Sequence, residues 1–395
     1  MSDIFRVALV FTSMLVMLRL KLGVGYVLVI ASALLSALYA MPIQGSADTV
    51  RATVTDSVTI KLFFALTFIK MFETILREKQ VMKAMMEASR GLLKRRRAVI
   101  VSMPLLIGML PSLGGAYFSA PMVEEATKGL RMPPEEKGFI NYWFRHPWEY
   151  VLPLYPGILL AAAISGIELR SFILANSVYA VLIILTGFLF SMRKAAGPVA
   201  KHGGRQFTGT WSFLPVVLVL VSVTVFHVEL HYALAFVIAL LFLHYRFVFH
   251  DMFRVVRHGF SPDIILLIFG AMLFKFTMDK SGAVANLSRY FTETGFPMLP
   301  ILVLLPFVSG LLTGLTVGFV GSTFPLLISI AGGAHLNQLT LAFAAGFTGV
   351  LLSPVHICLV LSREYFKADI AKIYRKTVPA SGIILSAALV EYFIL

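Results

Sequence analysis

Residues 141–150 place an arginine, a histidine and a glutamate among aromatic residues at the start of an otherwise apolar segment. Arg145 could hold a carboxylate through two parallel hydrogen bonds, because its guanidinium group presents N–H donors in a fixed fork. His146 or Glu149 could carry a proton, since histidine titrates near neutral pH and ionised groups inside a membrane are costly and often functional. Arg145 lies near the expected end of the segment, so it could instead extend to the membrane interface and anchor the helix there.

Three further ionisable residues occur in apolar sequence. His356 follows Pro354 after one residue, and it could bind a coupling ion or be a buried structural histidine. Glu73 lies three residues after a lysine and Asp279 four residues after one, so each carboxylate could pair with a lysine on one helix face. The alternatives for these two carboxylates are therefore a structural ion pair or a role in ion coupling.

The composition excludes a water-soluble globular chain and a disordered one. Of 395 residues, 58% are hydrophobic and 14% are charged, whereas charged residues make up about 25% of an ordinary soluble domain. A bilayer-spanning helix needs about 20 apolar residues, so the length allows about ten spans with short loops. The single cysteine, Cys358, excludes a disulfide framework and a cysteine-rich metal site. We expect no metal site and no organic cofactor, with Na⁺ or H⁺ as the coupling ion.

Two apolar segments are each interrupted by a short run rich in glycine, at 111–115 and at 313–318. The arms of the first segment have about 14 residues each, which as helix is about 21 Å. This is shorter than the hydrocarbon core of a bilayer, which is about 30 Å thick. The interruptions therefore predict two re-entrant helical hairpins, over residues 98–128 and 297–331. The alternative is that the glycines and prolines only kink ordinary spans.

The order of these features repeats along the chain. Residues 151–153 match residues 352–354, 201 positions later, and a hairpin precedes each. With five spans and a hairpin in each half, the second half has inverted topology, a recurring arrangement in transporters. We predict an all-α polytopic membrane protein with about ten transmembrane helices and two re-entrant hairpins. Its parts are a first repeat at 1–195, a cytoplasmic linker at 196–206 and a second repeat at 207–395.

The net charge of +14 comes mainly from loops on one side of this topology. If the arginines at 95–97 are cytoplasmic, 26 of the 34 lysines and arginines lie in or beside cytoplasmic loops. The positive-inside rule accounts for this bias, so the charge does not indicate a nucleic-acid partner. We predict a multi-pass protein of the cell (inner or plasma) membrane with both termini outside. The basic stretch at 77–97 could contact anionic membrane lipids.

Unwound backbone within a membrane occurs only where protein or a water-filled cavity satisfies it. The hairpin tips and the breaks at Pro153 and Pro354 should therefore meet near the midplane. Free N–H groups at the start of a hairpin arm favour an anion. The predicted substrate-binding residues are Ser112, Gly114, Gly115, Asn141, Arg145, Pro153, Thr313, Gly314, Thr316, Gly318, Ser353 and Pro354. The predicted ion-coupling residues are His146, Glu149, His356, Asp279 and Glu73.

Several motifs resemble an uncharacterised integral-membrane family of archaea and bacteria. The first is the run Leu-Pro-Ser-Leu-Gly-Gly-Ala-Tyr-Phe-Ser-Ala-Pro-Met-Val-Glu-Glu at residues 110–125, and the others are at 141–150, 153–157 and 353–356. The family is similar to gluconate permeases of the ion transporter superfamily, which includes arsenite, citrate and dicarboxylate transporters. The resemblance implies inverted repeats, a scaffold formed by the early spans, and a transport domain of hairpins and broken helices. It also implies elevator-like motion and a homodimer.

These features predict a secondary active transporter for a small organic anion, a sugar acid or carboxylate, coupled to H⁺ or Na⁺. A cation/proton antiporter on the same fold is the first alternative, with Glu149, Asp279 or Glu73 as the exchanging carboxylate. An intramembrane hydrolase is the second alternative. The sequence contains no Walker motif, nucleophile elbow or dinucleotide fingerprint, so we do not expect an enzyme.

Overall fold

The computed structural model describes residues 3–93, 95–111, 115–192, 207–295 and 297–394, and within these ranges the chain forms helices and no β-strand. The all-α class predicted from the sequence is confirmed for this part of the chain. Within it, five stretches are long and apolar enough to cross a bilayer: Pro134–Ser165, Leu169–Phe190, Phe249–Lys280, Leu336–Phe366 and Ile370–Ile394. They support a membrane protein, while the number of ten spans remains a prediction.

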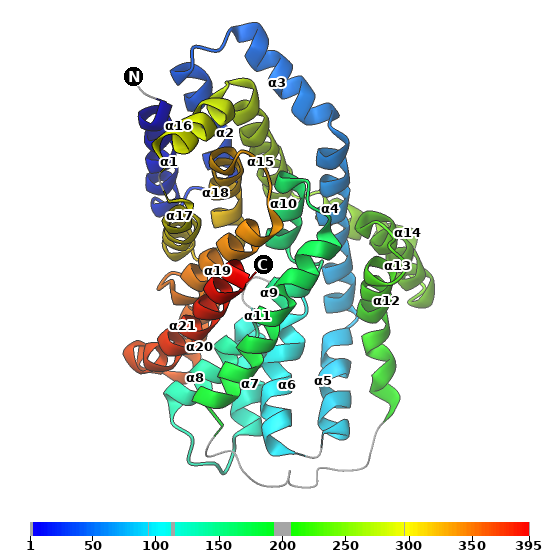
Figure 1. Ribbon diagram of the computed structural model, residues 1–395. Coiled ribbons are helices and arrows are strands. Elements are labelled where there is room, and N and C mark those ends of the chain that lie inside the picture. The colour runs from blue at the N-terminus through cyan, green and yellow to red at the C-terminus, as the bar shows by residue number, and fades with distance from the viewer. Residues whose placement is uncertain (1–2, 94, 112–114, 193–206, 296, 395) are drawn as a thin grey trace.

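The chain begins with a set of helices that leads to the first helix pair. They are α1 (Asp3–Arg19), α2 (Val24–Leu38), α3 (Ile43–Thr55), α4 (Ser57–Glu78) and α5 (Val81–Leu92). α4 begins at Ser57, where the Asp56 carboxylate accepts a hydrogen bond of 2.8 Å from the Thr59 N–H. α3 lies across one end of the molecule before the chain turns into α4 (Figure 1).

The first predicted hairpin corresponds to two short helices that pack against each other, α6 (Arg96–Gly108) and α7 (Gly115–Ala126). They have 13 and 12 residues. As helix this is about 18–20 Å, so neither could cross a hydrocarbon core about 30 Å thick. The next segment is interrupted twice and forms α8 (Pro134–Trp143), α9 (Trp148–Val151) and α10 (Pro156–Ser165). Prolines stand at both interruptions, where they lack an N–H donor and disfavour a continuing helix.

The middle of the chain adds a further set of helices. They are α11 (Leu169–Phe190), the 3₁₀ helix η1 (Phe207–Phe213), α12 (Leu214–Thr224), α13 (Leu230–His244), α14 (Phe249–Gly259), α15 (Pro262–Lys280) and α16 (Ala283–Thr294). α14 packs against α4 with Val255 buried. Figure 1 shows α12, α13 and α14 grouped beside α4. The predicted linker at 196–206 lies outside the described residues.

The last part of the chain contains the second helix pair and the second interrupted helix. The elements are α17 (Met298–Thr313), α18 (Thr316–Ala331), α19 (Leu336–Leu352), α20 (Ile357–Phe366) and α21 (Ile370–Ile394). α17 packs against α18, and the chain turns between them at Gly314, whose φ of +64° lies in the left-handed region. The interruption between α19 and α20 covers residues 353–356. It includes Pro354, at which the sequence predicts a break.

α19 lies at the centre of the packing. Every residue from Leu339 to Leu351 is buried, and α19 packs against both α17 and α21. Gly310 allows α17 to approach α19 closely, because a Cβ at this position would overlap the Gly346 carbonyl. The breaks on either side of α9 and after α19 consequently lie in the middle of the molecule (Figure 1). The repeat symmetry and its boundaries remain predictions.

Candidate functional site

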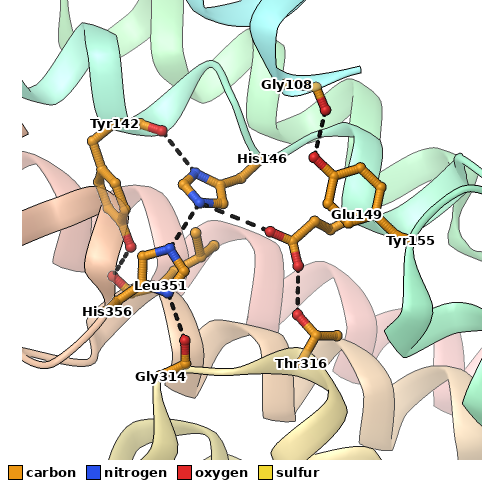
Figure 2. A network of polar contacts seen from close by, with 9 residues as sticks. All are labelled: Gly108, Tyr142, His146, Glu149, Tyr155, Gly314, Thr316, Leu351 and His356. Carbon is orange, nitrogen blue, oxygen red and sulfur yellow. Dashed lines mark hydrogen bonds and ion pairs between the residues drawn. The ribbon is translucent and has the colours of Figure 1, made fainter. Parts of the chain in front are cut away.

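The two interrupted helices meet where each is broken (Figure 2). The hydroxyl of Tyr142, on α8, donates a hydrogen bond of 2.8 Å to the carbonyl of Leu351 on α19. His146 follows α8 and His356 precedes α20, and their Nε2 atoms are 3.0 Å apart although 210 positions separate them in sequence. α8 also packs against α20. The contact therefore belongs to an interface between distant parts of the chain.

Both imidazole rings are held by backbone carbonyls. Nδ1 of His146 lies 2.7 Å from the carbonyl oxygen of Tyr142, and Nδ1 of His356 lies 2.7 Å from that of Gly314. A carbonyl only accepts hydrogen bonds, so each Nδ1 carries a hydrogen and donates it. Both rings are buried. The backbone thus fixes each ring's orientation and leaves the two Nε2 atoms facing each other.

Glu149, on α9, lies beside the histidines. Its Oε2 accepts a hydrogen bond from the hydroxyl of Thr316 at the start of α18. Its Oε1 is 3.9 Å from Nε2 of His146. Thr316 lies so close to Gly157 that a Cβ on the glycine would overlap the threonine side chain. Glycine at this position therefore allows α10 and α18 to approach and brings the second helix pair to the first break.

The first helix pair is attached to the same break. The Tyr155 hydroxyl donates a hydrogen bond to the Gly108 carbonyl at the end of α6, and the Trp148 indole N–H donates one of 2.7 Å to the Leu105 carbonyl. Gly108 also lies directly against the backbone of Arg145. Both helix pairs and both breaks therefore converge on one buried region, the central cluster. It comprises Tyr142, Arg145, His146, Glu149, Thr316, Ser353 and His356.

Arg145 is the charged group of the central cluster that lacks full hydrogen bonding. Its side chain is 4% exposed, so it lies inside the protein and does not extend to an interface. Its Nε and Nη1 atoms are buried with no hydrogen-bond partner among the described residues, as is Oγ of Ser353. Leaving a buried donor without a partner costs about 1–3 kcal/mol, and more for a charged group. A bound anion would satisfy these donors.

Asn141, a predicted substrate residue, bonds to groups of the protein itself. Its Oδ1 accepts a hydrogen bond of 2.6 Å from the Ser119 hydroxyl, and its Nδ2 donates to the Ala116 carbonyl at 2.9 Å and to the Ser362 hydroxyl at 2.8 Å. The side chain is fully buried. These bonds connect α7, α8 and α20, so the polar atoms of Asn141 already have partners within the protein.

A cleft of about 850 Å³ reaches the second helix pair and the second break. Its lining includes Thr313 and Pro354 together with Arg19 and Lys21 from the turn between α1 and α2. Gly318, another predicted substrate residue, lies against the side chain of Thr313. The cleft therefore connects residues predicted to contact substrate with two basic side chains.

The other predicted substrate residues have backbone roles or lie outside the described part of the chain. Gly115 is the first residue of α7 and is buried. Pro153 is buried in the turn between α9 and α10, and Gly314 contributes a carbonyl to the central cluster. Ser112 and Gly114 lie outside the described residues.

Two predicted ion-coupling residues are not brought to the central cluster. Glu73 is buried on α4 and pairs with Lys70 at 3.5 Å and with Arg77 at 2.5 Å on the same helix. Asp279 is exposed near the end of α15, four residues after Lys275. Within the described residues, neither carboxylate bonds to the cluster. Of the two alternatives for Glu73, a structural ion pair or a role in ion coupling, its contacts favour the structural ion pair.

Sequence reasoning missed three residues near the centre. Tyr142 lies four residues before His146, and this spacing places both on one side of a helix, which was an available signal. Cys358 is buried, and its ligand atom lies within 4.8 Å of those of both histidines. Its position two residues after His356 was the available hint. Tyr155 could be singled out only by its place between two prolines.

These observations define a class, an all-helical membrane protein with a buried ionisable cluster where interrupted helices meet. A family model matches residues 4–395, and its description is "Protein of unknown function (DUF401)". Because the match covers nearly the whole chain, the protein belongs to this family. No curated protein matches the chain. The relation to gluconate permeases remains a prediction.

Proposed function

We propose that this protein is a secondary active transporter of a small organic anion, a sugar acid or carboxylate, coupled to H⁺ or Na⁺. Arg145 carries the proposal, because it is a buried guanidinium group with two unpartnered nitrogens at the meeting point of the helix breaks. A carboxylate matches such a group, since two parallel hydrogen bonds satisfy its donors and its charge together. Backbone N–H groups at the starts of α18 and α20 would add partial positive charge.

The proposed architecture has two inverted repeats, each with five spans and one re-entrant hairpin, as in relatives of the gluconate permeases. Each half of the chain contributes one pair of short packed helices and one interrupted helix, which supports this plan. Contacts between the two breaks, above all His146 with His356, support a shared site between the repeats. In transporters with inverted repeats, substrate and coupling ions bind at such broken helices.

Ion pairs between distant segments support a common side for the basic loops, which the proposed orientation makes cytoplasmic. Arg254 pairs with Glu78 at 3.1 Å, and a second pair of 3.1 Å joins the starts of α8 and α21. In the proposed orientation, these four segments face the cytoplasm. Lys61 and Glu229, which are 2.8 Å apart, then lie on the outer side.

The cleft beside the second helix pair supports access for an anion. Arg19 and Lys21 would raise the local concentration of anions, and Thr313 and Pro354 line the same cleft. In alternating access, a second conformation would open the cluster to the other side. The membrane potential contributes about 2.3 kcal/mol per elementary charge per 100 mV, so uptake of an anion into a negative interior needs accompanying cations.

A cation/proton antiporter is the second candidate, and Glu149 favours it. This carboxylate is held by a neutral hydroxyl and lies 3.9 Å from a histidine, so it could exchange a proton for Na⁺. Such a protein would need no organic anion, and the unpartnered donors of Arg145 would have no role. Neither candidate is an enzyme.

Uptake and charge movement in proteoliposomes test the two candidates. We expect a saturable response to one class among sugar acids, monocarboxylates and dicarboxylates, which depends on a Na⁺ or pH gradient. Arg145→Lys keeps the charge but removes the planar fork, so it should weaken the response, whereas the matched variant Arg77→Lys on α4 should retain it. Currents on Na⁺ or pH jumps alone would favour the antiporter. No uptake of any acid would contradict the organic anion.

A further inference from the structure

We propose that His146 and His356 share one proton between their Nε2 atoms, so that the pair carries a single positive charge. The inference rests on the proposed function for its purpose, since it identifies H⁺ as the coupling ion. The proton itself follows from the geometry of the two rings and does not depend on transport.

Hydrogen positions on the Nδ1 atoms determine what the Nε2 atoms can do. Each Nδ1 lies 2.7 Å from a backbone carbonyl and therefore carries a hydrogen. A neutral imidazole with its hydrogen on Nδ1 has only a lone pair on Nε2. Two neutral rings would direct their lone pairs at each other across 3.0 Å, which is repulsive. One added proton converts this contact into a charge-assisted hydrogen bond of ordinary length.

The contact between the two rings has the geometry of a hydrogen bond between nitrogens. The ring centroids are 5.0 Å apart and the Nε2 atoms 3.0 Å, so the rings meet nitrogen to nitrogen and not face to face. The thiol of Cys358 lies within 4.8 Å of a ring nitrogen of each histidine. A zinc ion placed off the line between the nitrogens could keep bonds of about 2.0–2.1 Å, so elemental analysis of the purified protein accompanies the measurement of the proton.

The groups that face the histidine pair, within the described residues, come from several elements. Glu149 on α9 is 3.9 Å from the nearer Nε2 and stabilises a positive charge there. Arg145, between α8 and α9, opposes that charge. The ring of Tyr142 on α8 and the thiol of Cys358 on α20 also face the pair, and the turn between α17 and α18 contributes a carbonyl. The shared proton thus has one carboxylate beside it.

The shared proton sets the charge that a substrate meets. Arg145 is permanently positive, and an ionised Glu149 cancels that charge. With the proton bound, the net charge of these four side chains becomes positive, and a monovalent organic anion makes it neutral again. Proton and anion therefore raise each other's affinity, and thermodynamic linkage requires the effect to be reciprocal. Because each raises the affinity of the other, the proton and the anion bind together, as symport requires.

Solid-state nitrogen NMR of the full-length protein with ¹⁵N-labelled histidine tests the shared proton without any transport. We expect both Nδ1 atoms to be protonated, with one protonated and one unprotonated Nε2 coupled across the hydrogen bond. His146→Gln and His356→Gln assign the signals, and His258→Gln, an exposed residue of α14, is the control that leaves them unchanged. Two unprotonated Nε2 atoms, two protonated ones, or stoichiometric metal in elemental analysis would overturn the inference.

Proteoliposomes separate this inference from the proposed function. In His356→Gln the glutamine amide can donate to Nε2 of His146, so the contact persists without a shared proton. We expect anion flux to fall, because no bound proton raises the affinity for the anion, and the proton movement per transported anion, read with an internal pH dye, to be lost. Unchanged proton movement would overturn the inference. If the wild-type protein has the shared proton but transports no anion, only the proposed function is overturned. If it transports an anion with Na⁺ and lacks the shared proton, only the inference is overturned.

Discussion

Glu73, which is buried, and Glu149, which is partly buried, are two carboxylates that are neutralised in different ways. Glu73 pairs with Lys70 and Arg77 from its own helix, at 3.5 and 2.5 Å. Glu149 has partners from other elements, the hydroxyl of Thr316 at the start of α18 and the imidazole of His146 before α9. The first set of contacts is local in sequence, and the second exists only in the assembled fold.

This difference indicates which charge responds to a conformational change. An ion pair within one helix stays intact when that helix moves as a rigid body. The surroundings of Glu149 exist only while a helix break and a separate helix pair stay together, so relative movement of these parts changes its charge balance. A ligand can shift a protein between two conformations only if its binding free energy differs between them, and a change in the charge balance around Glu149 would supply such a difference. The central cluster is therefore the region where we expect function, and we expect the pairs on α4 to be structural.

Replacing the arginine of each region should give the largest contrast. Arg145→Met removes the proposed counter-charge of the anion. Truncating one partner of a buried charge pair costs about 2–5 kcal/mol, or roughly 30-fold or more in affinity. Because Nε and Nη1 of Arg145 have no partners among the described residues, the melting temperature should not fall. Arg77→Met, whose parent side chain is 53% exposed, is the matched control and should leave binding unchanged.

Equilibrium binding of the transported acid and thermal unfolding in nanodiscs measure these effects. Full binding by Arg145→Met would remove this residue from the substrate site. Lost binding together with a large drop in melting temperature would indicate a structural role instead.

Glu149→Gln should give the next largest effect. A hydrogen bond that involves a charged group contributes about 1.5–3 kcal/mol, so gradient-driven uptake should fall by roughly 10–100-fold. Glutamine has a similar size, and its carbonyl oxygen can still accept the hydroxyl of Thr316, so the fold should be retained. Initial uptake rates measure the change, and the melting temperature checks the fold. An uptake rate equal to that of the wild type would show that transport does not use the charge of Glu149.

Local features of the site could be predicted from the sequence. Prolines and glycines at 111–115, 147–156 and 353–354 indicated the breaks, because these residues limit the backbone where they stand. The pair of Glu73 with Lys70 on α4 follows from a spacing of three residues. These predictions did not depend on which helices pack against each other.

Contacts between distant elements could not be predicted. His146 and His356 were both candidates, but their contact depends on the packing of α8 against α20 across 210 positions. The burial of Arg145 depends on Gly108, which lets α6 approach its backbone. In each case a partner far away in sequence decides the result.

Asn141→Ala tests a neutral residue that lies in the same region as Arg145 and Glu149. The change leaves the Ser119 and Ser362 hydroxyls and a backbone carbonyl of α7 without this partner. The free energy of unfolding should fall by about 1–3 kcal/mol. Substrate affinity of the folded fraction should change little, because the polar atoms of Asn141 are already bonded within the protein. A large loss of affinity with unchanged stability would place Asn141 in the substrate site, as the sequence first predicted.

Glu73→Gln should have the smallest effect. Its partners Lys70 and Arg77 have side chains that are 34% and 53% exposed, so water solvates them when the carboxylate is removed. Partly exposed pairs of this kind contribute about 0–1 kcal/mol, and a neutral amide is easier to bury than a carboxylate. Uptake should stay within about twofold of the wild type, as expected for a pair that adds so little free energy. If Glu73→Gln abolished uptake while Glu149→Gln did not, the roles of the two carboxylates would be reversed, and ion exchange at Glu73 on α4 would follow.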